Sequence, residues 1–374
     1  MRRRALLTTY QNTYVPDVPD VPDPIDTIYY LTIEALEDGL TASLSRNDCE
    51  YCVDGDGNWK SLAAGTDTES INSGQTLSFR GNLTPVYYKG VGTFTISNKC
   101  NIEGNCMSML FGDNAANNYS LSGKNYAFCK LFYDCTNVVN VSSNFLPVVT
   151  IAYECYKEMF KGCTSLTTAP ELPATTLASN CYQLMFEGCT NLTTAPELPI
   201  TTLADSCYRS MFSNCTSLTT APELPATTLA NYCYNGMFNG CTSLVNAPEL
   251  PATALADYCY YGMFGDCTSL TTAPELPATT LAENCYGSMF SKCSSLTTAP
   301  VLPATTLAEC CYYYMFWLCR NLNYIKMLAT DISATDCLYK WVEGVSSTGT
   351  FVKNTAMTTL PTAISSSYAG IPKR

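Results

Sequence analysis

The side chains in this sequence with the widest range of chemistry are its 22 cysteines, and the chain has no histidine. Histidine is the commonest general base, the usual partner of serine and cysteine nucleophiles, and the usual nitrogen ligand of catalytic zinc. Catalysis would therefore depend on lysine or on paired carboxylates, and no unique pair stands out among the repeated acids. The sequence predicts a chain that is not an enzyme, with no catalytic residues, no metal and no cofactor.

Most of the cysteines recur every 26 residues, in two series that lie four residues before and four residues after the Met of a repeated Met-Phe pair. The first series is Cys155, Cys181, Cys207, Cys233, Cys259, Cys285 and Cys311, and the second is Cys163, Cys189, Cys215, Cys241, Cys267, Cys293 and Cys319. Stacked repeats would place equivalent residues about 5 Å apart, which is within disulfide range. Buried free thiols are the favoured interpretation because cysteine is a small, commonly buried residue; disulfides and a metal site are the alternatives.

Two more columns of identical residues follow the same period. Tyrosine recurs at Tyr156, Tyr182, Tyr208, Tyr234, Tyr260, Tyr286 and Tyr312, and glutamate recurs at Glu171, Glu197, Glu223, Glu249 and Glu275. The tyrosines could stack on sugars, but their i, i+4 relation to the phenylalanines favours packing in or beside the core. The glutamates would repel one another and attract a cation, although exposed turns tolerate such a column through solvation.

Two short motifs before the repeats are also compatible with chemistry. Cys49-x-x-Cys52 could be a disulfide or a redox pair, although no helix pattern follows it. Asp54, Asp56 and Asn58 resemble the first ligands of a calcium loop, but the later positions of the EF-hand pattern do not match. A β-turn between two strands is therefore the favoured interpretation of this loop.

The charge of the chain restricts its partners. The net charge is −12, and only 14% of the residues are charged. Nucleic acids and anionic membranes attract clustered lysine and arginine, so neither is an expected partner. The N-terminus begins like a signal peptide, but polar residues 8–12 interrupt it, and no apolar run approaches the length of a membrane span. We therefore expect no membrane insertion and recognise no Sec signal peptide.

Each 26-residue unit predicts one coil of a repeat solenoid. Residues 166–169 are compatible with a short strand, which Pro170 and Pro173 end. Residues 177–189 lack proline, and their apolar residues at i, i+4 and i+8 predict a short helix. One coil cannot bury its apolar face alone, but stacked coils can. The expected fold class is an α/β repeat solenoid with a short strand and a short helix per coil, preceded by a small all-β, sandwich-like domain.

The repeat also separates structural positions from variable ones. Equivalent positions in two neighbouring coils define the expected structural ladders, Cys181, Met185, Phe186, Cys189, Leu192, Cys207, Met211, Phe212 and Cys215. Coils differ mainly at residues 179–180, 183–184 and 187–188 and their equivalents, all on the predicted helical limb. A specific ligand would suit this variable limb, whereas a repetitive polymer would suit the constant Thr-Thr-Ala-Pro-Glu-Leu-Pro limb. The candidate binding residues on the variable limb are Asn180, Gln183, Arg209, Tyr232, Asn235, Tyr258, Tyr261 and Tyr313.

The chain divides into four expected segments. They are a basic stub with a proline-rich extended linker (1–26), a β-sandwich-like domain (27–100), the solenoid (101–322, regular from 155) and a C-terminal cap and tail (323–374). The β-sandwich-like domain is expected because residues 30–35, 75–79 and 92–96 alternate apolar and polar side chains.

The repeat resembles a known family. Met-Phe-x-x-Cys-x-x-Leu-Thr, as at residues 185–193, is similar to the leucine-rich repeats of the BspA-like surface-protein family, strongly over 155–322 and weakly over 106–150. The Ala-Pro-Glu-Leu-Pro segment at 169–173 departs from the apolar, strand-like segment that those repeats more often carry. The whole arrangement also resembles repeat proteins carried by gut-bacterial phages and prophages. These resemblances imply a curved leucine-rich-repeat solenoid that attaches to proteins, matrix or other cells.

The sequence therefore predicts a non-enzymatic binding or adhesion protein presented on a virion or a cell surface. The expected context is a phage virion, as a tail-fibre-like or head-fibre-like host-recognition component, and the alternative is a BspA-like bacterial adhesin. A purely structural spacer and a carbohydrate-active enzyme with two carboxylates are further alternatives. The expected partner is a glycan or protein of the host cell surface, with virion attachment or self-association through the N-terminal segment.

Overall fold

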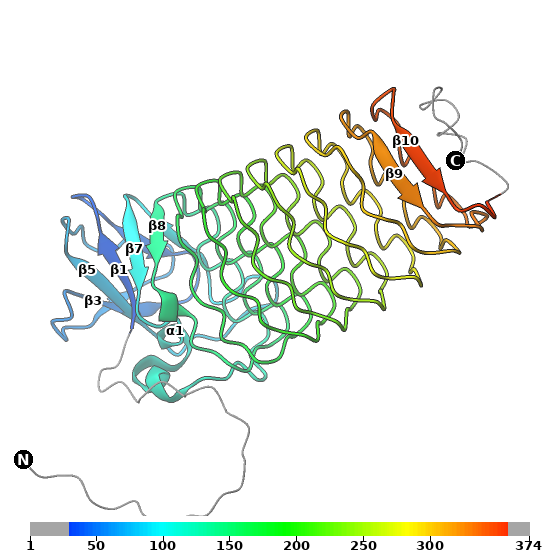
Figure 1. Ribbon diagram of the computed structural model, residues 1–374. Coiled ribbons are helices and arrows are strands. Elements are labelled where there is room, and N and C mark those ends of the chain that lie inside the picture. Colours follow the sequence, from blue (N-terminus) through cyan, green and yellow to red (C-terminus); the bar gives the residue numbers. More distant parts are fainter. Residues whose placement is uncertain (1–29, 358–374) are drawn as a thin grey trace, which may run out of the picture.

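The N-terminal part of the chain is a β-rich unit from which a long stack of coils extends (Figure 1). The computed structural model describes residues 30–357. The proline-rich segment predicted at 1–26 and the last residues of the tail lie outside the described range. None of the helices in the described range has the length and apolar character needed to span a membrane.

The larger sheet of the N-terminal unit has six strands in the order β4-β3-β5-β1-β7-β8. These strands are β4 (Lys60–Leu62), β3 (Cys49–Val53), β5 (Thr76–Arg80), β1 (Leu31–Ala35), β7 (Cys100–Glu103) and β8 (Val138–Val141). In β1 the apolar residues Leu31, Ile33 and Ala35 are buried and alternate with half-buried polar residues. This period of two is what predicted the strand from the sequence.

A second, two-stranded sheet packs on the first. It pairs β2 (Ala42–Leu44) with β6 (Phe94–Ile96) in antiparallel register. Phe94 packs edge-on against Phe79 of β5, with 5.0 Å between the ring centroids, so the two sheets share one core. Helical structure in the described range amounts to α1 (Ser108–Phe111) and the 3-10 helices η1 (Gly112–Asn117) and η2 (Ser143–Phe145).

The larger sheet continues directly into the coils through its last strand. β8 lies parallel to β7, and Asn140 of β8 forms a β-bridge to Thr168 of the first regular coil. The same bridge then joins Thr168 to Thr194 and Thr194 to Thr220, one residue per coil. The strand predicted at 166–169 is therefore reduced to single bridges, and Pro170, which has no amide to donate, follows closely. One apolar core runs from the first strand to the end of the described chain.

Each coil contains a limb of consecutive β-turns, which we call the turn limb and define by residues 178–189 and their equivalents in other coils. Within the limb an amide bonds to the carbonyl three residues earlier, as Met185 N does to Tyr182 O at 3.2 Å. Every second amide instead bonds to the next coil, as Phe160 N does to Met185 O at 2.9 Å. This alternation satisfies backbone groups that belong to neither a helix nor an extended strand.

The helix predicted over residues 177–189 is wrong. Asn180, Leu184 and Gly188 have positive φ angles of 56°, 58° and 74°, which a right-handed helix cannot contain. The turn unit repeats every four residues. Cys181, Met185 and Cys189, which are four residues apart, therefore share one face, as they would on a helix. The chain is a repeat array of turns and bridges, compatible with a repeat solenoid but not with an α/β alternation.

Columns of identical side chains fill the interior of the array. All the predicted ladder residues, Cys181, Met185, Phe186, Cys189, Leu192, Cys207, Met211, Phe212 and Cys215, are fully buried. Phe186 and Phe212 stack nearly parallel with 5.7 Å between ring centroids, and Tyr182 and Tyr208 do so at 5.9 Å. The tyrosine column thus packs in the core, as predicted, and the cysteines of both columns are free thiols. Truncating one such buried phenylalanine to alanine costs about 3–5 kcal/mol in known proteins.

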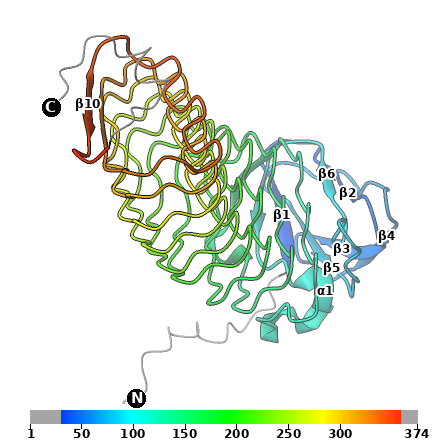
Figure 2. The same cartoon turned by 90° about the vertical axis from the view of Figure 1, so that its right-hand side faces the viewer.

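The array ends in a parallel pair of strands (Figure 1), and Figure 2 shows the second of them, β10, at the far end of the stack. They are β9 (Tyr324–Met327) and β10 (Thr350–Lys353). Trp341 is fully buried there, and its ring lies 6.3 Å from Phe316, the last ring of the phenylalanine column, and 6.3 Å from Phe351 of β10. These residues close the apolar interior that an open last coil would expose to water.

Candidate functional site

The thiols of the second cysteine column have a structural role. Cys189 Sγ donates to Phe160 O at 3.1 Å, and Cys215 Sγ donates to Phe186 O at 3.1 Å, in each case one coil back. Burial raises the pKa of Cys215 well above its usual value, so the thiol stays protonated and remains a donor. A buried, protonated thiol is neither a nucleophile nor a good metal ligand.

The motifs before the repeats are occupied by local contacts. Cys49 and Cys52 lie on β3, both buried and both free. Asp54 accepts hydrogen bonds from Thr76 N and from Gln75 Nε2, each at 2.8 Å, and thereby ties the β3–β4 loop to β5. Asp56 accepts from the amide two residues later, as in a turn. In the described range no cluster of three or more potential metal ligands occurs.

The side chains that gather on the outer side of the turn limb are aromatic. We call them the C-terminal tyrosine strip, which comprises Tyr232, Tyr258, Tyr261, Tyr313, Tyr314, Trp317 and Tyr339. Tyr232 and Tyr258 stack at 4.7 Å, and Tyr313 and Tyr339 stack at 5.3 Å. Tyr339 is 43% exposed and the others are half-buried, so each ring is packed on one side and open on another.

A glycine connects the two halves of this strip. Tyr261, Gly287 and Tyr313 occupy the same position in three successive coils. A Cβ atom added to Gly287 would lie 2.7 Å from Cδ2 of Tyr261, so the tyrosine ring covers this glycine. Any larger residue at position 287 would displace the ring. The tyrosine side chain therefore lies across the intervening coil, toward Tyr313.

The electrostatics of the strip are locally balanced. Tyr258 donates its hydroxyl to Glu283 Oε1 at 3.2 Å. Burial, together with that carboxylate, raises the pKa of Tyr258 to about 12, so the phenol stays protonated to a higher pH than a free tyrosine does. Lys292 lies 5.8 Å from the Trp317 ring and is paired with Asp266 at 3.1 Å. The strip thus combines open aromatic faces with a paired lysine, and the exposed Arg209 lies at its border.

The predicted binding residues divide into two groups in the structure. Tyr232, Tyr258, Tyr261 and Tyr313 belong to the strip, and Arg209 lies at its border, with its guanidinium 5.8 Å from the Tyr232 ring. The other three lie on the same limb, Gln183 and Asn235 in the column of Tyr261 and Asn180 in the column of Tyr232, but outside the aromatic strip. Gln183 is buried, Asn235 is half-buried, and Asn180 Nδ2 donates to Glu154 Oε1 at 3.4 Å.

Sequence reasoning missed three members of the strip. Tyr314 and Trp317 lie in the last regular coil and Tyr339 in the coil that follows. Tyr314 occupies a positive-φ position, with φ of 53°, and the assumed helix would have pointed it in another direction. The signal that could have found them is the density of aromatic residues over 312–317.

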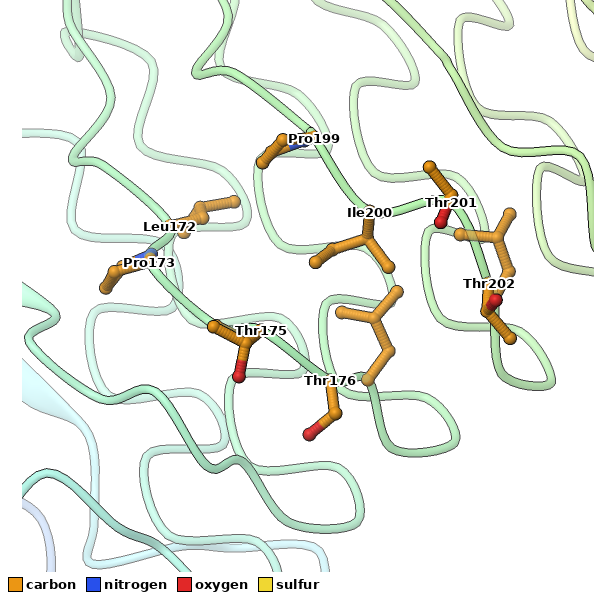
Figure 3. Close-up of a pocket in the computed structure, with 11 residues that line it drawn as sticks. Leu172, Pro173, Thr175, Thr176, Pro199, Ile200, Thr201 and Thr202 are labelled. Atoms are coloured by element: carbon orange, nitrogen blue, oxygen red, sulfur yellow. The ribbon is translucent and has the colours of Figure 1, made fainter. Parts of the chain in front are cut away.

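A second surface feature lies on the proline-threonine side of the coils (Figure 3). A cavity of about 660 Å³ opens between two coils and is lined chiefly by Leu172, Pro173, Leu177, Pro199, Ile200 and Leu203. Ile200 stands where neighbouring coils have a buried alanine, such as Ala174 and Ala226. In the described structure the bridge that joins Thr202 to Thr228 has no counterpart between Thr176 and Thr202. We interpret the cavity as the gap that the larger isoleucine creates.

No known family model matches the chain, and no curated protein or solved structure shows a significant similarity to it.

Proposed function

We propose that this chain is a non-enzymatic, surface-presented binding protein whose C-terminal tyrosine strip takes a glycan of a host cell surface. The observation that carries the proposal is the gathering of half-exposed rings on the outer side of the turn limb. Clustered exposed aromatic residues commonly mark binding sites, and tyrosine and tryptophan supply contact area at a small cost in conformational entropy.

The rigidity of the limb favours binding through these rings. Neighbouring turn limbs are joined by repeated backbone bonds, such as Tyr234 N to Cys259 O at 3.0 Å and Gly236 N to Tyr261 O at 2.8 Å. The residues that carry the rings are therefore fixed before any ligand arrives. Pre-organisation lowers the entropic cost of binding, which is large when loops must become ordered.

The chemistry of the strip favours a sugar over a protein ligand. A pyranose has an apolar C–H face that can lie on a ring and hydroxyls at its edge that can bond to tyrosine hydroxyls. The lysines near the strip are paired with carboxylates, as Lys340 is with Glu343 at 3.3 Å, so they offer little to an acidic partner. Each good ring contact is worth about 0.5–1.5 kcal/mol, so several together give micromolar to millimolar affinity.

A glycan microarray that carries neutral and acidic bacterial and host glycans tests this function. We expect the full chain to bind neutral members, and Tyr258→Ala with Tyr313→Ala to weaken binding at least about tenfold. Ile200→Ala is the matched control, because it changes the cavity on the proline-threonine side and should leave binding intact. Binding to host-surface proteins with no binding to any arrayed glycan would contradict a glycan ligand.

The biological context that we propose is a phage virion, in which the chain is a tail-fibre-like or head-fibre-like host-recognition component. The alternative is a bacterial cell-surface adhesin of the BspA-like kind. Mass spectrometry of purified phage particles and of bacterial envelope fractions separates the two. Peptides of this chain in particles would support the virion, whereas their presence only in the envelope would support the adhesin.

A further inference from the structure

A second group of tyrosines, two of them exposed, one half-buried and one buried, lies at the other end of the coils, and none of its members was predicted to bind a ligand. We call it the N-terminal tyrosine patch, which comprises Tyr87, Tyr88, Tyr126 and Tyr153. The ring centroids are 4.0 Å apart for Tyr87 and Tyr88, 4.9 Å for Tyr87 and Tyr126, and 5.5 Å for Tyr126 and Tyr153. Tyr87 is 63% exposed and Tyr88 is 45% exposed, which is unusual for large rings with apolar neighbours at hand.

The backbone holds these two exposed rings in place. Val86 and Gly90 exchange hydrogen bonds at 2.8 and 2.9 Å, which closes a tight loop with Tyr87 and Tyr88 at its tip. Gly90 has a φ of 52°, and a Cβ atom there would lie 2.7 Å from Cys129 O and 2.8 Å from Tyr126 O. Only glycine permits so close an approach, so the loop is docked against the turn limb that carries Tyr126.

The patch rests on a buried ion pair that neutralises its charge. Glu154 is 2% exposed and pairs with Lys157 at 3.2 Å, and Lys157 Nζ lies 5.3 Å from the Tyr88 ring. Lys130, which belongs to the same coil as Tyr126, pairs with Glu158 at 3.5 Å. As in the C-terminal tyrosine strip, aromatic faces are open and most of the neighbouring lysines are paired, although Lys89 of the same loop is exposed. The two surfaces therefore offer the same contacts, open rings suited to the apolar face of a sugar, and the net charge of −12 disfavours an acidic ligand.

The patch and the strip lie on the same limb. Tyr126 and Tyr232 occupy equivalent positive-φ positions, separated by the equivalent residues Glu154, Asn180 and Ser206. Four coil steps of about 5.8 Å, the spacing of the stacked rings, place them on the order of 23 Å apart. In the described structure the turn limb between them carries polar, charged and aliphatic side chains, among them Asn180, Leu184 and Arg209, but no exposed aromatic ring that would block a ligand laid across it.

We propose that the N-terminal tyrosine patch and the C-terminal tyrosine strip are two subsites for one extended, neutral polysaccharide that lies across the coils along the turn limb. The inference rests on the proposed function, because the strip is its first subsite. A coil step is close to the length of one pyranose unit, so a chain of such units can follow the turn limb. A chain long enough to reach both subsites binds the second one at high effective concentration and gains affinity without any new kind of contact.

Chain-length dependence tests the second subsite. The probes are neutral oligosaccharide ladders of about two to sixteen rings, from partial hydrolysis of glucan, mannan and galactan, titrated calorimetrically into the full chain. We expect an increase in affinity of tenfold or more once the chains reach both subsites, beyond on the order of five rings. Tyr87→Ala with Tyr88→Ala should abolish this increase and leave short-chain affinity unchanged. Both residues are exposed, and the melting temperature of the variant checks its folding.

The control variant is Tyr119→Ala, which removes a tyrosine that is 37% exposed and belongs to neither surface. It should behave as the unaltered chain with every ladder. If short chains bind but affinity does not depend on length, or if the Tyr87 and Tyr88 variant keeps that dependence, the second subsite is wrong while the proposed function stands. If the unaltered chain binds no ladder of any length, both proposals are wrong.

Discussion

The two cysteines of each repeat look alike in the sequence but have different environments. In the second column the thiol donates to a phenylalanine carbonyl one coil back, as Cys215 does to Phe186 O at 3.1 Å. In the first column the thiol bonds are longer: Cys259 and Cys311 donate to carbonyls of the next coil at 4.0 and 3.9 Å, and for Cys207, which is equally buried, the described structure contains no thiol bond within that range. The second column therefore depends more on a donor, and position 207 mainly on an apolar side chain of the right volume.

This difference predicts opposite preferences at the two positions. At position 215, Cys215→Ser should be more stable than Cys215→Ala, because the hydroxyl keeps the bond to Phe186 O. At position 207 the order should reverse, because a buried hydroxyl without a partner costs about 1–3 kcal/mol. Urea unfolding of the four variants in a reducing buffer measures both orders. The same preference at both positions would show that the two columns are equivalent.

At the scale of the coil, the turn limb depends on residues that tolerate a positive φ. Gly236 and Gly262 supply glycine at one of these positions, whereas Ser210 adopts the same conformation at a φ of 52°. A residue with a Cβ atom is strained there by roughly 1–2 kcal/mol relative to glycine. Ser210 therefore carries strain at a position where the two coils that follow have glycine.

Ser210→Gly should therefore stabilise the chain by about 0.5–1 kcal/mol. This gain is the backbone strain that glycine relieves, reduced by the conformational entropy that glycine adds to the unfolded state. Ser213→Gly, three residues later in the same turn limb, is the control. Ser213 is buried and has no positive φ, so its replacement by glycine should destabilise the chain. Thermal unfolding measures whether each variant gains or loses stability. A loss of stability in Ser210→Gly would contradict the turn geometry.

The sequence predicted the period, the buried columns and three strands of the N-terminal unit (β1, β5 and β6), but not its other strands or the turn limb. Cys181, Met185 and Cys189 share a face in a helix and in a chain of four-residue turns, so apolar spacing does not separate the two. The strip was only partly predicted for the same reason: Tyr232 and Tyr258 were found by their variability, whereas Tyr314 was assigned to a helix. The N-terminal tyrosine patch was missed because Tyr87 meets Tyr126 only through the docking of a loop across 39 residues of chain.

At the scale of the whole molecule, burial keeps many cysteine thiols and tyrosine phenols of the core protonated. Desolvation raises the pKa of Cys155 and of Cys233 to about 12, and raises the pKa of Tyr182 and Tyr208 well above its usual value. In the unfolded chain a thiol ionises near pH 8.5. Above that pH the unfolded state loses protons that the folded state keeps, so these groups favour unfolding progressively as the pH rises.

Stability should therefore be nearly constant from pH 6 to 8 with respect to these thiols, and should fall steeply above about pH 8.5. Each thiol that ionises only in the unfolded state contributes a slope of about 1.4 kcal/mol per pH unit, and the columns contain many such thiols. Urea midpoints at successive pH values in a reducing buffer measure the effect. A stability that does not change between pH 8 and 10 would contradict the buried, protonated columns.

Hydroxyl-radical footprinting of the full chain tests most directly whether ligands bind to the aromatic side of the turn limb. Oxidation of individual side chains is compared with and without a saturating neutral oligosaccharide from the same ladders. We expect slower oxidation of Tyr258, Tyr313 and Tyr339, with Tyr119 unchanged. Protection of Leu172 and Ile200 at the cavity, with unchanged oxidation of the tyrosines, would place the binding site on the proline-threonine side and contradict the proposed function.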